Sequence, residues 1–184
     1  MRRIYRRIVD DAIISRETRT RDRIRADIMS VIEDELSKVV DDVHPVEMYI
    51  FSKSIRSSYK NRNLCHVRVV DKIAYRNKTG EFVRDLPVAG DRVEYVVLHG
   101  IGKVSDRSED LEFFRDKLEN STRKLDRSWY VNNTFNGLNQ LTSLFIPPNW
   151  LRKKIDKCCK ELQGQQSGHK KITCFFQKKR MRRN

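Results

Sequence analysis

The sequence predicts a mostly helical α+β protein with a small β element. Apolar residues recur at three- and four-residue spacing over most of the chain, which indicates helices, and one stretch alternates as a strand does. Of the 184 residues, 38% are hydrophobic and 35% charged, a composition typical of a charge-rich globular protein with a modest core. No apolar run approaches the roughly 20 residues needed to span a bilayer. We therefore expect a soluble intracellular protein with no membrane contact.

The first 42 residues are predicted to be helical. Their apolar positions fall on one stripe of an amphipathic helix: Ile24, Ile28, Val31, Ile32, Leu36, Val39 and Val40. A weaker stripe of Ile4, Ile8 and Ile13 precedes it. The polar residues 15–23 between the two stripes are either a break or the solvated middle of one long helix. His44-Pro45 ends the helix, because the residue before proline is pushed out of the α region.

The central part of the chain combines short elements with glycine turns. Residues 46–61 are predicted to be a short strand or an extended entry into a brief helix. Residues 66–77 favour a short helix, which the turn at residues 78–80 ends. The turn Gly90-Asp91 then leads into a strand over Arg92–Leu98, and Gly100 and Gly102 end that strand.

The remainder is predicted to be helical again. One helix covers Asp110–Asn120, and Asp126 is placed to cap a longer helix that Pro147-Pro148 ends. The inward residues of the longer helix are Tyr130, Phe135, Leu138, Leu141 and Phe145. A basic helix over Trp150–Leu162 leads into a polar linker over residues 163–171.

The glycines and the carboxylates do not form a known catalytic pattern. Gly100-Ile101-Gly102-Lys103 lacks the third glycine of a dinucleotide site and the Ser/Thr of a phosphate loop, so a strand-end turn is the better interpretation. Adjacent acids such as Asp41-Asp42 and Glu109-Asp110 are expected to be solvated helix caps. No Asp-x-Asp between apolar residues indicates a two-metal centre. We expect no catalytic residue.

The four cysteines are expected to be ordinary reduced thiols. A zinc site could in principle combine Cys158, Cys159, His169 and Cys174, but the C-x₂-C spacing of such sites is missing. We therefore expect no metal site and no cofactor in this chain.

The charge is uneven along the chain. The formal net charge is +14, and residues 150–184 hold 12 Lys/Arg against 2 Asp/Glu, so they carry +10 of it and residues 1–149 carry +4. Such an excess favours a polyanionic partner. We divide the chain into a helical segment over residues 1–45, a basic domain over residues 46–149, and a basic helix and tail over residues 150–184.

An ordered set of anchors resembles the thumb of family B DNA polymerases. That family has Ile-Thr-Lys, a Tyr, His-Val before a short helix, a Gly turn, and Gly-Asp followed by a strand that ends in Tyr-Val. The matching positions here are Phe51-Ser52-Lys53, Tyr59, His66-Val67, Gly80 and Gly90-Asp91-Arg92-Val93-Glu94-Tyr95-Val96. Downstream, Ser108-Glu109-Asp110 and Asp126-Arg127-Ser128-Trp129-Tyr130 resemble the family's Ala-Glu-Asp element and its Asp-x-x-Tyr-Tyr helix. The resemblance covers about residues 25–146, with Ser52 in place of Thr and Trp129 in place of Tyr.

This resemblance implies the carboxyl-terminal portion of a polymerase. Residues 1–45 would connect palm and thumb, and residues 46–149 would be a thumb-like DNA-binding domain. The metal-binding carboxylates of a family B nucleotidyltransferase lie upstream in the palm, so magnesium is expected only there and this chain is not expected to be catalytic alone. The implied partners are duplex primer-template DNA, the palm and fingers, and a processivity factor. The basic end most resembles polymerases of large insect DNA viruses such as baculoviruses, and a stand-alone basic adaptor of a replication complex is the alternative.

A thumb grips the duplex through its backbone, so the candidate contacts are cations and hydroxyls. The predicted DNA-binding residues are Ser52, Lys53, Arg56, Tyr59, Lys60, His66, Arg68, Lys72 and Arg76. Lys53 and Tyr59 rank highest because they coincide with anchors of the family. For His66 the alternative is a structural role at the start of its helix. For each cation the alternative is a place on a solvated helix face.

The end of the tail carries a dense cluster of cations. Its members are Lys178, Lys179, Arg180, Arg182 and Arg183. Short runs of this kind serve in nuclear import or in tethering to phosphate, and the alternative is a merely solubilising terminus. We expect a nuclear protein, in the host nucleus if its source is a virus.

Overall fold

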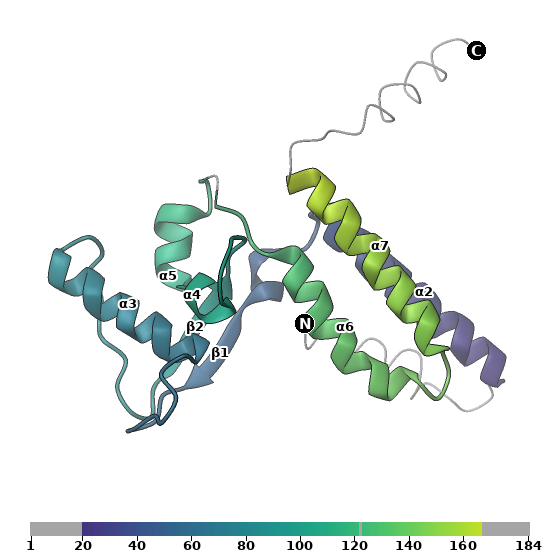
Figure 1. Ribbon diagram of the computed structural model, residues 1–184, viewed down its shortest axis with the longest axis horizontal. Helices are drawn as coiled ribbons and strands as arrows, with labels where there is room; N and C mark the ends of the chain where they lie inside the picture. Colours follow the sequence, from purple (N-terminus) through teal and green to yellow (C-terminus); the bar gives the residue numbers. More distant parts are fainter. Residues whose placement is uncertain (1–19, 122, 167–184) are drawn as a thin grey trace, which may run out of the picture. The chain divides into compact units, whose positions relative to one another are not determined.

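The computed structural model describes residues 20–121 and 123–166, which group into two compact units (Figure 1). The first unit is His44–Tyr130, and the second combines the described residues before His44 with those after Tyr130. The predicted division at residues 45 and 149 stays a prediction; within the second unit, the helices over Arg21–Val40 and Pro148–Gln166 pack together. The predicted class, mostly helical with a small β element, is confirmed.

The first unit is built on a three-stranded antiparallel sheet. Its strands are β1 (Phe51–Ser54), β2 (Arg92–Val97) and β3 (Ser108–Asp110), in the order β1-β2-β3. Phe51 lies opposite Tyr95 in the first pair, and Tyr95 lies opposite Asp110 in the second. The predicted strand after Gly90-Asp91 is therefore confirmed, and it ends at Val97. Beyond it, Leu98 forms a single bridge with Leu125.

The predicted order of elements within residues 46–61 was wrong. A 3₁₀ turn, η2 (Val46–Tyr49), comes first, and strand β1 follows it. Pro45 precedes the turn in extended conformation and its carbonyl accepts from the Met48 amide, at 3.0 Å. A proline that fixes the entry to a helical turn accounts for this order. The segment between β1 and residue 65 has no regular structure.

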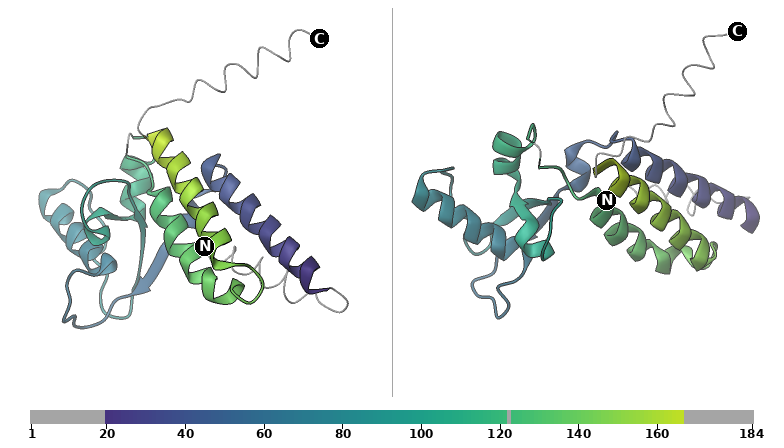
Figure 2. Two further views of the ribbon diagram at one scale, coloured as in Figure 1. Left: turned by 45° about the vertical axis from the view of Figure 1, so that its right-hand side comes forward. Right: turned by 45° about the horizontal axis from the view of Figure 1, so that its top comes forward.

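Helix α3 (Cys65–Thr79) covers one face of the sheet (Figures 1 and 2). Val69 and Ile73 pack there with the inward residues of β2 and with Tyr130. The buried Tyr130 hydroxyl accepts from the Val97 amide at 2.7 Å, which ties the sheet to the start of α6. Gly80, with φ of 72°, ends α3 in the left-handed conformation that glycine adopts at least cost.

The other face of the sheet is covered only in part. Helix α4 (Val104–Arg107) leads into β3, and α5 (Leu111–Phe113) continues into the π turn η3 (Phe114–Leu118). Leu111 and Phe114 pack on Val96 and Leu98. The Asp110 side chain accepts from the Phe113 amide and so caps α5. The helix predicted over Asp110–Asn120 is thus present as two short pieces, and the Arg92 end of this face stays exposed.

The described residues of the second unit form α2 (Arg21–Val40), most of α6 (Arg127–Thr142) and α7 (Pro148–Gln166). Helices α2 and α7 lie side by side (Figures 1 and 2). Their buried apolar residues include Ile28, Ile32, Leu151 and Ile155. Thr20 caps α2, so a helix begins within the polar stretch 15–23; the stripe of Ile4, Ile8 and Ile13 lies outside the described residues.

Three predicted helix boundaries in this unit were wrong. Helix α6 ends at Thr142, before Pro147-Pro148, whereas Pro148 is the first residue of α7. Proline is well suited to that first helical position because its missing amide would have no partner there. At its other end α7 runs to Gln166, so part of the predicted linker is helical. The Asp126 cap was correct, since its side chain accepts from the Trp129 amide at 2.9 Å.

Within the described residues, no helix combines the length and apolar character required to cross a bilayer.

Candidate nucleic-acid interface

The nine predicted DNA-binding residues separate into three environments. The open cluster is Lys53, Arg56 and His66, next to the loop that holds Tyr59 and Lys60. The paired row is Arg68, Lys72 and Arg76 along α3. Ser52 lies apart from both, with Arg92. DNA contact by each of these residues stays a prediction.

The open cluster forms where β1 approaches the first turn of α3. Lys53 lies directly opposite Val93, so both side chains point to the face that α3 covers. Val93 is buried there, whereas Lys53 is exposed at the end of the strand. Burial first, and then the charges of Lys53 and Arg56, lower the pKa of His66 below its ordinary value. The two cations are therefore close enough to His66 to disfavour a third positive charge.

Tyr59 organises the loop that follows β1. Its hydroxyl accepts from the Arg56 amide at 2.8 Å and lies 3.4 Å from the Ser54 carbonyl, to which it can donate. Its ring packs edge-on against His66, with centroids 5.3 Å apart. In the free chain Tyr59 thus shapes the loop, and its phenol edge stays at the surface beside the cations.

The cations of this region have no carboxylate partner. Among the described residues, no Asp or Glu forms an ion pair with Lys53, Arg56 or Lys60. The first turn of α3 also contains no acidic residue. Clustered cations without local counter-charges attract an external anion, and phosphate oxygens accept hydrogen bonds from ammonium and guanidinium groups alike.

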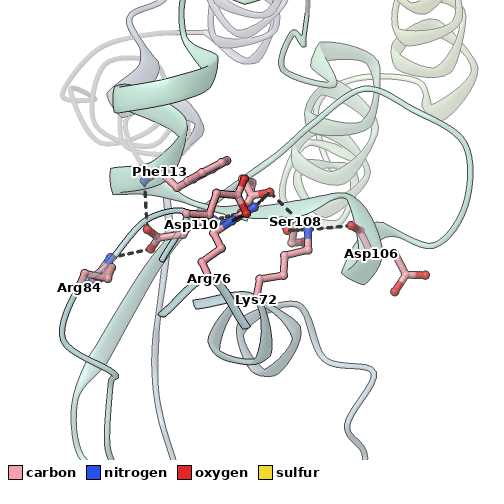
Figure 3. A network of polar contacts seen from close by, with 9 residues as sticks. Lys72, Arg76, Arg84, Asp106, Ser108, Asp110 and Phe113 are labelled. Atoms are coloured by element: carbon pink, nitrogen blue, oxygen red, sulfur yellow. Dashed lines mark hydrogen bonds and ion pairs between the residues drawn. The ribbon is translucent and has the colours of Figure 1, made fainter. Parts of the chain in front are cut away.

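The paired row faces carboxylates of the same unit (Figure 3). Arg76 makes a forked pair with Glu109, with N–O distances of 2.7 and 3.1 Å. Lys72 donates to the carbonyls of Ser108 and Asp106, at 2.6 and 2.9 Å, and its amine lies 3.5 Å from Glu109. Arg68 pairs with Asp106 at 3.3 Å on the surface. This row ties α3 to the segment that contains α4 and β3.

Glu109 and its neighbour Asp110 are buried, which overturns their interpretation as solvated caps. Glu109 is 2% exposed and Asp110 1%. Burial by itself would raise the pKa of Glu109, but the hydrogen bond from Arg76 and the charges of Lys72 and Arg76 bring it below the usual value. Burial lowers the pKa of Lys72 although Glu109 opposes that shift. Asp110 does cap a helix, and it also pairs with Arg84 at 2.7 Å.

These ion-pair partners were not predicted from the sequence. Arg84 comes from the loop before β2 and also lies 3.0 Å from Glu112, while the Arg76 guanidinium stacks 3.4 Å from the centre of the Phe113 ring. Arg107 pairs with Asp126 in the same unit. The local signal that could have indicated burial of Glu109 and Asp110 is their position directly before the apolar Leu111.

Ser52 lies on the opposite face of the sheet from Lys53. Arg92 lies across β1 there and donates to the Ser52 hydroxyl at 2.9 Å, to the Ser52 carbonyl at 3.1 Å and to the Ser54 hydroxyl at 3.3 Å. The Ser52 side chain is therefore part of an exposed Arg92 network, separate from the open cluster.

The described part of the chain holds no group of three or more His, Cys, Asp or Glu that could bind a metal ion. Of the zinc combination considered above, Cys158 is buried and the Cys159 thiol accepts from Asn132, at 3.2 Å. His169 and Cys174 lie outside the described residues, as do the predicted tail contacts Lys178, Lys179, Arg180, Arg182 and Arg183.

A family model and a solved structure are similar to this chain. A family model described as DNA polymerase family B matches residues 1–144. The fold is similar to that of the family B DNA polymerase from the hyperthermophilic archaeon Pyrobaculum calidifontis, with a TM-score of 0.55 and 15% sequence identity. That match covers 87% of this chain but only 17% of the archaeal chain. At this identity the likeness concerns the fold alone. No curated protein matches the sequence.

Proposed function

Because this chain belongs to the family B DNA polymerases, we propose that it is the thumb portion of such an enzyme and grips primer-template duplex DNA. The match over residues 1–144 supports the polymerase origin. The chain covers only 17% of the archaeal enzyme, which supports the proposal that it corresponds to one portion of such a polymerase. The observation that carries the DNA grip is the open cluster, where Lys53 and Arg56 lie near His66 and have no carboxylate partner among the described residues.

In this proposal the open cluster binds phosphates of the duplex backbone. Contacts of this kind position the duplex but carry no sequence information, which suits a polymerase that must bind every sequence. The paired row has a different task. Since Arg76 and Lys72 are held by Glu109, they fix α3 on the sheet and so keep His66 beside Lys53.

The chemistry of nucleotide transfer belongs, in this proposal, to a palm outside this chain, together with its magnesium. No residue described here is assigned a catalytic role. The proposed protein partners are the palm and fingers of the same polymerase and a processivity factor. A baculovirus-like viral source would agree with the basic end of the chain.

Duplex binding by the 184-residue chain tests this function. Affinity is measured over a range of salt concentrations, because each phosphate contact contributes a slope of about −0.9 in log K against log salt. We expect Lys53→Ala/Arg56→Ala to reduce the steepness of the slope by about 1.8. Lys78→Ala/Lys117→Ala removes the same charge from exposed positions elsewhere and is the matched control. Equal slopes for the two double variants would contradict a specific role for the open cluster.

The cations Lys178 to Arg183 are proposed to direct the chain to the nucleus or to tether it to DNA. Import depends on a receptor, so it should transfer to a reporter fused to residues 178–184. Tethering should instead appear in the purified protein, as a shallower salt slope after that segment is deleted. A deletion that changes neither property would leave a solubilising terminus.

A further inference from the structure

The loop over residues 99–103, between β2 and α4, presents an isoleucine to solvent. Ile101 is fully exposed, between two glycines. Gly102 has φ of 103°, a conformation that other residues rarely adopt, so the turn itself requires glycine there. An apolar side chain at the tip of such a turn gains nothing from the folded chain, because it makes no buried contact.

The base of this loop is held firmly. Leu98 bridges to Leu125, and the His99 amide donates to the Lys124 carbonyl at 2.8 Å. On the inner side the Arg107 guanidinium donates to the Leu98 carbonyl at 2.9 Å, and Arg107 is itself paired with Asp126. A tip on a fixed base loses little conformational entropy when it binds a partner.

Cations occur next to the tip in the sequence and in the segment that pairs with the loop base. Lys103 follows Gly102, and Arg123 and Lys124 belong to the segment that pairs with the loop base. All three side chains are exposed, and none forms an ion pair with a carboxylate of the described residues. An apolar residue that enters the minor groove between cations on the adjacent phosphates is a common arrangement in proteins that bind duplex DNA.

We propose that Ile101 enters the minor groove of the bound duplex while Lys103 and Lys124 contact phosphates on either side of it. This inference rests on the proposed function, since it assumes that the chain binds duplex DNA. The spacing is compatible with one duplex. Val93, opposite Lys53, and Leu98, at the loop base, are separated by about 17 Å of extended strand. That is about half of one turn of B-DNA, roughly 34 Å.

The test compares an apolar substitution with a charge substitution. Ile101→Ser should weaken duplex binding about tenfold at every salt concentration, because it removes buried apolar area without removing an ionic contact. Lys103→Ala/Lys124→Ala should instead reduce the steepness of the salt slope by about 1.8. Val83→Ser, at another exposed apolar position of the same unit, is the matched control and should leave affinity unchanged.

The outcomes separate the two proposals. If the unmodified chain binds duplex DNA with a steep salt dependence but Ile101→Ser binds equally well, the minor-groove inference is overturned and the proposed function stands. If the unmodified chain binds no duplex, both are overturned. Ile101→Leu keeps an apolar tip and should retain affinity, and thermal unfolding of Ile101→Ser should match the unmodified chain because the side chain is fully exposed.

Discussion

At its first turn, α3 carries His66 beside Lys53 and Arg56, which have no carboxylate partner among the described residues. Further along the same helix, Lys72 and Arg76 lie against the buried Glu109. Both regions are strongly basic in sequence. The cations of the paired row lie against carboxylates of the same unit, whereas those of the open cluster are available to an external anion. Local charge density therefore does not identify a binding surface; the location of the counter-charges does.

The largest effect is expected on the unfolding free energy, from a substitution that breaks the paired row. Glu109→Ala leaves Arg76 and Lys72 without their carboxylate in a largely buried site, and removal of one partner of a buried pair costs about 3–5 kcal/mol of unfolding free energy. Urea unfolding of the first unit would be followed through Trp129, which packs on Phe51 and Tyr130. A Trp150→Phe background removes the signal of the other tryptophan.

Glu94→Ala is the control for that experiment, because Glu94 is an exposed acid on the adjacent strand β2. Its effect should stay within about 0.5 kcal/mol, as for most surface substitutions. A loss below about 1 kcal/mol for Glu109→Ala would show that the paired row is not the structural tie described here.

An intermediate effect is expected from His66 in the open cluster. Its pKa in the free chain is lowered, so a nearby DNA phosphate should raise it and binding should take up a proton. Affinity should therefore increase as pH falls through the pKa of His66 in the DNA-bound state, by up to about tenfold for each unit by which DNA raises the pKa, and level off below the free-chain pKa. His66→Gln should abolish this component of the pH dependence.

The pH dependence of folding stability at His66 has the opposite sign to that of DNA affinity. Because the folded pKa lies below the unfolded value of about 6.5, the contribution of neutral His66 to stability is complete above that value and declines as pH falls through it. Unfolding measured at each pH separates this loss from the gain in binding. An affinity that weakens on acidification while the fold is intact would contradict a phosphate beside His66.

The smallest effect is expected on the opposite face of the sheet. Arg92→Ala removes exposed hydrogen bonds to Ser52 and Ser54, so we expect a loss of about 0.5–1 kcal/mol in unfolding free energy. If those bonds are the cause, Ser52→Ala should have little further effect in the Arg92→Ala background. Equal losses from Ser52→Ala with and without Arg92 would contradict the coupling.

Local signals in the sequence predicted much of the fold. The strand after Gly90-Asp91, the end of α3 at Gly80 and the Asp126 cap each depend on residues within a few positions, and each was found. The turn before β1 and the start of α7 were not, because a proline predicts a helix start as readily as a stop.

The candidate site was harder to predict because it depends on distant partners. Arg76 and Glu109 are 33 positions apart in sequence, and no periodicity connects them. The predicted DNA-binding residues from Ser52 to Arg76 were therefore treated as one surface. The carboxylates of residues 106–110 divide it, and this division follows only from the packing of α3 against β3.

Lysine acylation with and without duplex DNA, followed by mass spectrometry, tests the central claim residue by residue in the unmodified chain. We expect Lys53 and Lys60 to react readily in the free protein and to be protected by DNA. Lys72, whose amine is held by Glu109 and two carbonyls, should react slowly in both states, and the exposed Lys78 should react equally in both. Unchanged reactivity of Lys53 at saturating duplex, or protection confined to Lys72, would contradict the division between the open cluster and the paired row.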